Sequence, residues 1–437
     1  MKKIIIIITF IIFLVTVMVL TLCSHQKNNK LNAPSSWFEN PTTESPSDIT
    51  PFTNVNVSDT AFHFWSWQKF LSLTRTNQTK APFENLVQVD NYGNKIGSTI
   101  ILNDTTQAGS GAVLYDKTNH PIYYTIHFNI KMYNFQQKYQ PLFAEIINKF
   151  KQEKNADILI QTELNKIGFD TINFPVSSYI LKTSWILASS LPSTEGYYVT
   201  NGQTSNDTTK TVKIALTGMH IIGRVYNHPE FIWATYEHKG LAPNYSWDDY
   251  GYPKLNQIIS DSDYVFYTKK TNFNNCIMMN GQSQFNSVFN IYPYGMVRSF
   301  IGTHYPSKSD IKNNENIVSL DKSVNKYLIE EKSVWSNYFY KGSVWLDAKN
   351  SNFGPGNSSI GNLTNPSLKG ARAISNITME TYTQLFSNGI YTGGSMNCFG
   401  CHNTVDFDNP IKNGDAFSYN LCISHAFRNG VKERTSK

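Results

Sequence analysis

Cys398, Cys401 and His402 lie in the segment CFGCH, which has the form Cys-x-x-Cys-His. Two cysteines at this spacing lie on one side of a helical turn, where both thiols can form thioethers to the vinyl groups of one porphyrin. The histidine that follows the second cysteine can then bind the iron as its proximal ligand. The pattern therefore predicts one covalently attached haem c.

Two other kinds of site also contain Cys-x-x-Cys. A thioredoxin-like redox dithiol would lie in an early strand–helix unit, whereas this motif lies near the C-terminus. A zinc ribbon would need a second Cys-x-x-Cys pair, and the sequence contains none. The haem interpretation is therefore favoured over both.

The motif does not specify the distal ligand of the iron. No methionine follows His402, although small electron-carrying cytochromes usually place one there. The candidates are His425, downstream of the motif, and Met379, His220 and His238, upstream of it. An open distal position is the remaining possibility, and it would favour an enzyme over an electron carrier.

Glu237 and His238 are weak catalytic candidates. A carboxylate and an imidazole near an open haem edge could move the proton that peroxide heterolysis requires. A surface salt bridge or a hydrogen-bonded strand histidine would explain the same residues. His220 has the same ambiguity, since it lies within an apolar strand-like run.

The segment 1–23 predicts a leader. Lys2 and Lys3 precede an apolar run from Ile4 to Leu22, as in the n-region and h-region of a secretory signal. The segment LTLC resembles a bacterial lipobox, in which Cys23 would be lipidated; an uncleaved anchor and a simple secretory signal are the alternatives. Each predicts an extracytoplasmic protein, in the periplasm or at the cell surface of a bacterium, and the first two predict membrane attachment through the leader.

The composition predicts a large globular protein. The chain has 437 residues, of which 40% are hydrophobic, 14% aromatic and only 16% charged. It can therefore bury a core much larger than one cytochrome domain needs. A net charge of +6, without a basic run with interleaved aromatic residues, argues against a nucleic-acid partner. Cys276 and Cys422 could form a disulfide in an oxidising compartment or remain separate buried thiols.

Four regions follow from the residue patterns. After the leader (1–23), residues 24–57 are rich in Asn, Ser, Thr and Pro and predict a disordered tether. Residues 58–310 predict a β-rich body with an aromatic helix at its start, a helix over 141–154 and several strands. Residues 311–437 predict a helical haem-bearing region, packed on the body, with helices from 319 and over 377–386 and a frayed basic tail. The fold class is therefore α+β, with an antiparallel β-rich body and a helical, haem-bearing C-terminal part.

Several segments carry a family resemblance, and they occur in this order: FHFWSWQKF, QAGSGAVLYD, GMHIIGRV, FIWATYEH, SVWSNYFYKGSVW, NITMETY and MNCFGCHN. Over roughly residues 60–437 the chain resembles large secreted or lipid-anchored bacterial c-type cytochromes. The resemblance implies a covalent haem and an extracytoplasmic location. It assigns roles only to Cys398, Cys401 and His402, and it implies no substrate.

Two functions are compatible with these observations. The first is single-electron transfer by a mono-haem cytochrome c to a redox partner protein that the sequence does not identify. The second is a haem-dependent, peroxidase-like oxidoreductase, because the chain is far longer than an electron carrier requires. A third, weaker hypothesis is a surface binding protein whose aromatic residues line a ligand cleft and whose haem is structural.

Overall fold

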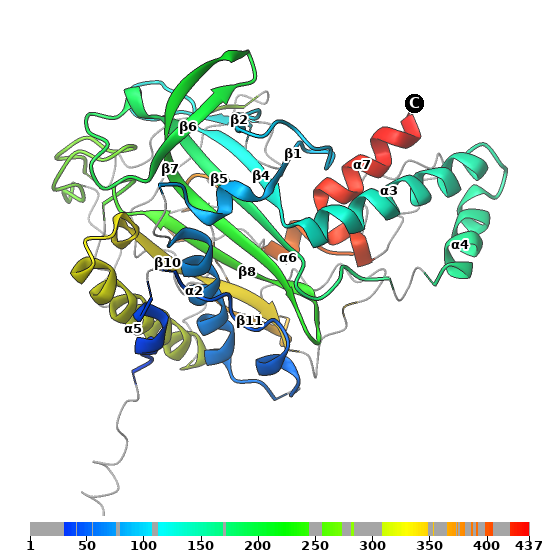
Figure 1. The fold of residues 1–437 in the computed structure, drawn as a ribbon, viewed down its shortest axis with the longest axis horizontal. Coiled ribbons are helices and arrows are strands. Elements are labelled where there is room, and N and C mark those ends of the chain that lie inside the picture. The colour runs from blue at the N-terminus through cyan, green and yellow to red at the C-terminus, as the bar shows by residue number, and fades with distance from the viewer. Residues whose placement is uncertain are drawn as a thin grey trace, which may run out of the picture.

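A computed structural model describes residues 30–40, 42–54, 56–75, 79–106, 112–168, 172–243, 256–272, 281–283, 308–347, 353, 365–372, 374, 376–380, 386–387, 390–391, 398–404 and 420–436. The fold is organised around one large twisted sheet with helices on its front and at one end (Figure 1). The α+β prediction is confirmed, since helices and an antiparallel sheet form one packed body.

The main sheet has nine strands, in the order β1-β4-β5-β7-β8-β10-β11, with β6 paired to β7 and β2 paired to β6. All its pairs are antiparallel except β2 with β6. The strands are β1 (Val87–Val89), β2 (Ile100–Leu102), β4 (Tyr123–Phe128), β5 (Tyr179–Leu187), β6 (Val199–Thr204), β7 (Asp207–Val225), β8 (His228–His238), β10 (Tyr338–Leu346) and β11 (Leu368–Gly370). Two small ladders join β3 (Ala112–Leu114) to β9 (Gly281–Ser283) and β12 (Phe386–Ser387) to β13 (Ile390–Tyr391).

The hairpin of β7 and β8 is the centre of the sheet. Val225 pairs with His228 across a tight connection, and Asn227 there has φ 61°. Asparagine tolerates this left-handed conformation better than most residues, which suits a two-residue hairpin turn. The hairpin therefore fixes the register of the strands that later position the polar residues of the candidate site.

One face of the sheet packs against the aromatic helix α2 (Asp59–Thr74). The ring centroid of Trp67 lies 5.4 Å from that of Tyr236, and Phe70 stacks on the same tyrosine with centroids 4.2 Å apart. All three side chains are fully buried, so the aromatic stretch near the start of the body forms core. Helix α5 (Lys308–Glu330) lies beside α2 in front of the sheet (Figure 1).

Three further helices pack together at one end of the sheet (Figure 1). Helix α3 (Ile130–Phe150) begins well before the predicted start and contains Pro141 in its interior. Asn129 caps it by accepting a hydrogen bond from the Met132 N–H, as short polar residues do at helix starts. Helix α4 (Ala156–Lys166) follows it, and α7 (His425–Ser436) lies alongside it. The basic C-terminal segment is thus helical as far as Ser436, and the prediction of a frayed tail is wrong.

The C-terminal region is not only helical. Strands β10 and β11 belong to it, and β10 pairs with β8 in the main sheet. Residues 311–437 therefore complete the body, and the boundary at residue 310 separates no independent unit. The helix predicted over 377–386 is absent from residues 376–380, which form a turn; residues 381–385 lie outside the described part of the chain.

The segment predicted as a disordered tether packs against the body from residue 30 onward. Trp37 and Phe52 are buried, and each lies in a short 3-10 helix. The Leu31 and Ala33 N–H groups donate to serine hydroxyls of α5. The polar composition led to a wrong prediction here because two large apolar side chains are enough to anchor an otherwise polar segment.

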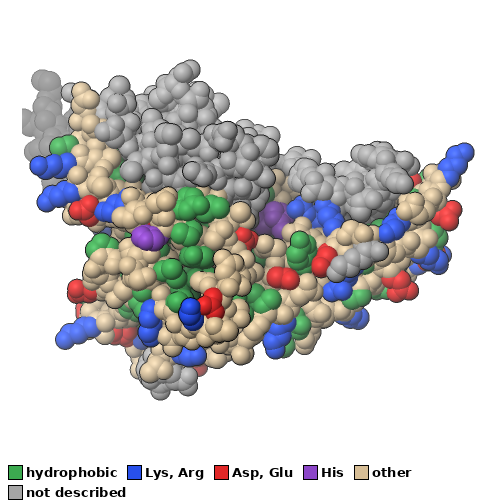
Figure 2. All heavy atoms as spheres, turned by 90° about the horizontal axis from the view of Figure 1, so that it is seen from above, with side chains coloured by type: hydrophobic (Ala, Val, Ile, Leu, Met, Phe, Trp, Pro, Cys, Tyr) green, Lys and Arg blue, Asp and Glu red, His purple; other side chains and the backbone are tan. Residues whose placement is uncertain are grey.

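The surface carries charges of both signs. On the face seen in Figure 2, basic and acidic side chains are interspersed around the described elements. Within the described residues, no helix has both the length and the apolar character that a membrane crossing requires. The predicted leader lies outside the described residues.

The packing of the N-terminal segment predicts that Phe52→Ala destabilises the protein by about 3–5 kcal/mol, the usual cost of a buried Phe truncation. Phe52 is completely buried, and its ring centroid lies 5.2 Å from that of Phe62.

Ile49→Ala is the matched control for this change, because Ile49 is 50% exposed. It should alter the unfolding free energy by less than about 0.5 kcal/mol, as surface substitutions usually do. Chemical denaturation measures both variants. If both variants changed the unfolding free energy negligibly, the N-terminal segment would be a tether and not part of the packed body.

Candidate functional site

The Cys-x-x-Cys-His motif forms one helical turn. Cys398 and Cys401 are the ends of α6 (Cys398–Cys401), and the His402 N–H donates to the Cys398 carbonyl at 2.7 Å. This hydrogen bond, between residues four apart, continues the turn through the histidine. The three side chains expected to act together therefore come from one short, rigid element.

His402 is held in a defined orientation. Its Nδ1 lies 2.9 Å from the carbonyl oxygen of Ile423, in the 3-10 helix Asn420–Ile423. A carbonyl oxygen only accepts, so Nδ1 carries the proton and Nε2 is left with its lone pair. Trp233 of β8 packs against the ring with centroids 4.4 Å apart. An imidazole fixed in this tautomer is prepared to bind a metal through Nε2.

His425 lies against His402. The two rings stack with centroids 3.9 Å apart and an interplanar angle of 18°, and His425 Nε2 donates to the Cys401 carbonyl at 3.0 Å. The His425 ring lies flat against the His402 imidazole, and its Nε2 is used for the Cys401 carbonyl. His425 therefore supports the motif and is not placed as a second ligand.

The electrostatics of the two thiols differ from those of a redox dithiol. Burial raises the pKa of Cys398 well above its usual range and also raises the pKa of Cys401, and the carboxylate of Glu380 adds to both shifts. Burial lowers the pKa of His402, and the adjacent His425 lowers it further. Reactive Cys-x-x-Cys pairs instead have lowered thiol pKa values, which make a nucleophilic thiolate.

A polar row crosses the sheet near the motif. Lys182 of β5 pairs with His220 of β7, and His220 pairs with Thr235 of β8. Paired residues of neighbouring strands share one face, so the three side chains lie on the same side. Trp233 lies on that side too, two residues before Thr235, where it contacts His402. The face opposite to α2 is therefore the one that carries both the polar row and the Cys-x-x-Cys-His motif.

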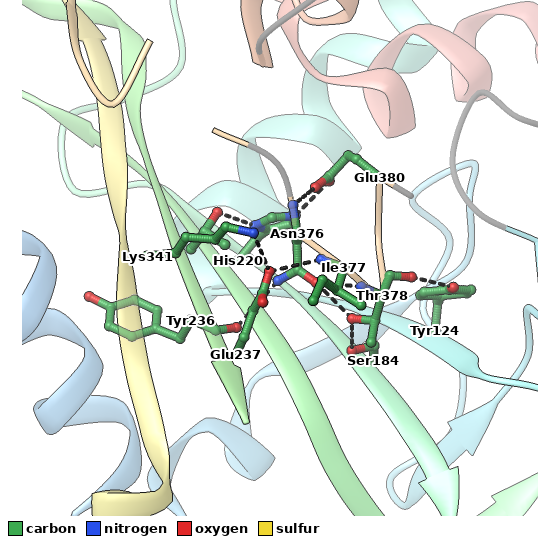
Figure 3. Close-up of polar contacts among 11 residues, drawn as sticks. Tyr124, Ser184, His220, Tyr236, Glu237, Lys341, Asn376, Ile377, Thr378 and Glu380 are labelled. Carbon is green, nitrogen blue, oxygen red and sulfur yellow. Dashed lines mark hydrogen bonds and ion pairs between the residues drawn. The ribbon is translucent and has the colours of Figure 1, made fainter. Parts of the chain in front are cut away.

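The segment from Asn376 to Glu380 covers part of this face (Figure 3). Its backbone is held by the buried carboxylate of Glu237, whose Oε1 accepts from the Ile377 N–H at 2.8 Å and from Lys341 Nζ at 3.3 Å. Thr378 bonds Ser184 through the two hydroxyls. The segment is thus fixed to β5 and β8, and Lys341 of β10 shares the Glu237 carboxylate with it.

Glu380 and His220 form an ion pair close to the motif. His220 Nε2 lies 2.6 Å from Glu380 Oε1, and His220 Nδ1 lies 2.8 Å from the Thr235 hydroxyl. Burial acts to raise the pKa of Glu380, but His220, Lys182 and the Asn376 N–H together lower it overall. Lys182 also lies over the ring of Tyr124, with Nζ 5.4 Å from the centroid.

Glu237 and His238 do not act together. They are consecutive residues of β8, so their side chains point to opposite faces of the sheet. Glu237 binds the 376–380 segment, whereas His238 Nδ1 accepts from the Gly240 N–H and Nε2 donates to the Gly196 carbonyl. Burial lowers the pKa of His238 to about 4. The prediction of a catalytic pair formed by these two residues is therefore wrong.

The upstream distal candidates are also engaged elsewhere. Met379 is completely buried in the apolar cluster that contains Ile377 and Tyr267, and His238 is held by backbone groups. His220 shares its face with Trp233 but uses both ring nitrogens for Thr235 and Glu380. The described residues therefore bring none of the predicted distal ligands to His402 in a ligating position.

The sequence did not identify Trp233, Lys182 and Glu380 as site residues. Lys182 is a charged residue within an apolar strand, and Trp233 is a large aromatic residue within another. Such residues indicate a site only when the strand register is known. Cys23 and Cys276 lie outside the described residues, so lipidation and the disulfide stay predictions; Cys422 is buried.

No group of three or more His, Cys, Asp and Glu residues in the described part of the chain could hold a metal ion by itself. Comparison with known proteins finds no matching family model, no matching curated protein and no matching solved structure.

The Glu380–His220 pair predicts a pH-dependent effect of Glu380→Gln. The pKa of Glu380 is lowered in the folded state, so its stabilisation is present above the unfolded pKa and is lost as pH falls through the folded pKa. At pH 7 the variant should be less stable by roughly 1–3 kcal/mol, and the difference should shrink below about pH 4.

Urea unfolding at several pH values measures this difference. Glu195→Gln serves as the control, because Glu195 is exposed and should show no such trend. A loss of stability that is the same in neutral and in strongly acidic buffer would contradict the ionic character of the pair.

Proposed function

We propose that this protein is an extracytoplasmic mono-haem c-type cytochrome that transfers single electrons. Cys398 and Cys401 attach the haem, and His402 is its proximal ligand. The observation that carries the proposal is the single helical turn that holds both thiols and presents His402 with Nδ1 bound to the Ile423 carbonyl. When bound, haem supplies a one-electron iron couple.

The surroundings of the motif suit a haem. After burial, the positive charges of Lys182 and Arg428 contribute to the lowered pKa values of His402 and His425. If haem is bound, Lys182 and Arg428 are the cations near the motif that would pair with its carboxylates. Trp233 contacts both His402 and Phe399, with ring centroids 4.4 and 6.1 Å away. It orients the proximal ligand and limits water around it.

The location belongs to the same proposal. The leader of residues 1–23 directs export, and either lipidated Cys23 or the uncleaved apolar run attaches the protein to the membrane. Haem c is attached in the extracytoplasmic compartment, so the motif and the leader support one another. The redox partner is a further protein whose identity the chain does not specify.

The haem assignment predicts distinct results for the motif residues. The double variant Cys398→Ser/Cys401→Ser should lose covalently bound haem on a denaturing gel stained for haem. His402→Ala should keep the thioethers but lose its normal visible spectrum, because the proximal ligand is missing.

Cys422→Ser and His120→Ala are the controls, and both should retain the wild-type stain and spectrum. Coexpression with a haem-attachment system is part of the experiment. An unstained wild-type protein under those conditions would refute the proposal.

A second candidate function is a haem-dependent oxidoreductase, which the polar face of the sheet favours. Glu380 and His220 lie on the face that Trp233 shares with His402, and His220 Nε2 lies 2.6 Å from Glu380 Oε1 there. Titratable groups next to a cofactor can take up or deliver protons during turnover.

The two functions predict different responses to carbon monoxide. An enzyme with an exchangeable site should bind CO in the ferrous state and shift its Soret band at micromolar concentrations. A simple electron carrier with two strong axial ligands should give the same spectrum with and without CO. Absorption spectroscopy of the reduced protein decides between them.

A further inference from the structure

A second feature of the molecule lies away from the haem motif. A cavity of about 550 Å³ opens beside the ends of α2 and α5, on the side of the sheet opposite to Trp233. Its size is within the range of small-molecule sites. Its walls come from distant parts of the chain, among them residues 38–40, Tyr198, Glu331 and residues 333–335.

The one arginine in the wall does not recruit an anion. Arg75 NH1 donates to the Trp37 carbonyl and the Thr43 hydroxyl, and NH2 donates to the Asn40 carbonyl and to Glu331. The N–H bonds of its two terminal nitrogens are therefore all in use. Arg75 is also only 6% exposed, so it serves as a structural clamp of the N-terminal segment.

The remaining charges in the cavity are negative. Glu331 binds Arg75 through Oε1 at 2.7 Å and its side chain is 35% exposed, which leaves Oε2 able to accept from a ligand. Glu39 is exposed at the same cavity. Helices α2 and α5 both end there, and the negative ends of their dipoles favour a cation.

Aromatic rings form the apolar part of the wall. Tyr198 and Trp335 stack with centroids 4.7 Å apart, and Phe38 stacks on Tyr327 at 4.3 Å. These pairs hold the rings of Phe38, Tyr198 and Trp335 in fixed positions at the cavity. The Arg75 guanidinium already lies over the Phe38 ring, 5.1 Å from its centroid, so Tyr198 and Trp335 are the rings that remain for a ligand. Rigid aromatic faces next to carboxylates are the arrangement that proteins use for ammonium and quaternary ammonium ligands.

We propose that this cavity binds a small organic cation, an ammonium or quaternary ammonium compound. Glu331 and Glu39 hold its positive charge, and Tyr198 and Trp335 contact its apolar part. A neutral molecule of the same shape would lose the charge interaction, and an anion would be repelled by both carboxylates. The site is independent of the haem motif and would operate whether or not the protein is a cytochrome.

Isothermal titration of the full chain tests this site with three probes. Choline chloride should bind, whereas its neutral isostere 3,3-dimethyl-1-butanol should bind at least roughly tenfold more weakly, and inorganic phosphate should not bind. Raising the ionic strength should weaken choline binding. Equal binding of choline and the isostere, or no choline binding up to millimolar concentrations, would overturn the proposal.

Three variants locate the site. Glu331→Gln and Glu39→Gln should each weaken choline binding by roughly three- to tenfold. Glu44→Gln, an exposed change outside the cavity, should leave it unchanged. Within the described residues the Glu39 side chain makes no ion pair or hydrogen bond, so Glu39→Gln remains informative if Glu331→Gln disturbs the contacts of Arg75. If the Glu39→Gln variant melts at the wild-type temperature and binds choline with unchanged affinity, the assignment is wrong.

Discussion

The buried carboxylate of Glu237 is the interaction on which the arrangement of the site depends. It accepts from the backbone of Ile377 and from Lys341 inside the sheet, so it joins β8, β10 and the segment that leads to the haem motif. A buried charge is costly unless it is paired and hydrogen-bonded, and its removal would leave Lys341 and the Ile377 N–H without this acceptor. This contact holds the segment 376–380 over the polar face of the sheet, which brings Glu380 within hydrogen-bonding distance of His220.

The local geometry of the Cys-x-x-Cys-His motif was easier to predict from the sequence than the contacts around it. Spacing alone predicted that Cys398, Cys401 and His402 share one turn, because helical geometry is local. The roles of Glu237 and His238 depend on which face each residue meets, and that is set by pairing between distant strands. The α+β class was predictable from periodicity, whereas the packed N-terminal segment was not, since its order comes from buried aromatic side chains that its composition conceals.

The two sides of the sheet have different chemistry. The side facing α2 is an aromatic core that carries the rings of Trp67, Phe70 and Tyr236. The other side carries a row of buried charged and hydroxyl groups, the proposed haem motif and a second apolar cluster that contains Ile377, Met379 and Tyr267. If the proposed function is correct, the large sheet separates an aromatic core from a face on which titratable groups would surround the cofactor.

The place of β10 in the sheet has a consequence for biogenesis. Strand β8 ends at His238 and lies between β7 and β10 in the sheet. Strand β10 begins only at Tyr338, after a long intervening stretch of chain. On the proposed export route, the free edge of β8 stays open to pairing with other chains until those later residues have crossed the membrane, which makes the nascent protein prone to aggregation. The Cys-x-x-Cys-His motif follows β10 in the chain, so on the same route it arrives only after the strand that closes this edge of β8.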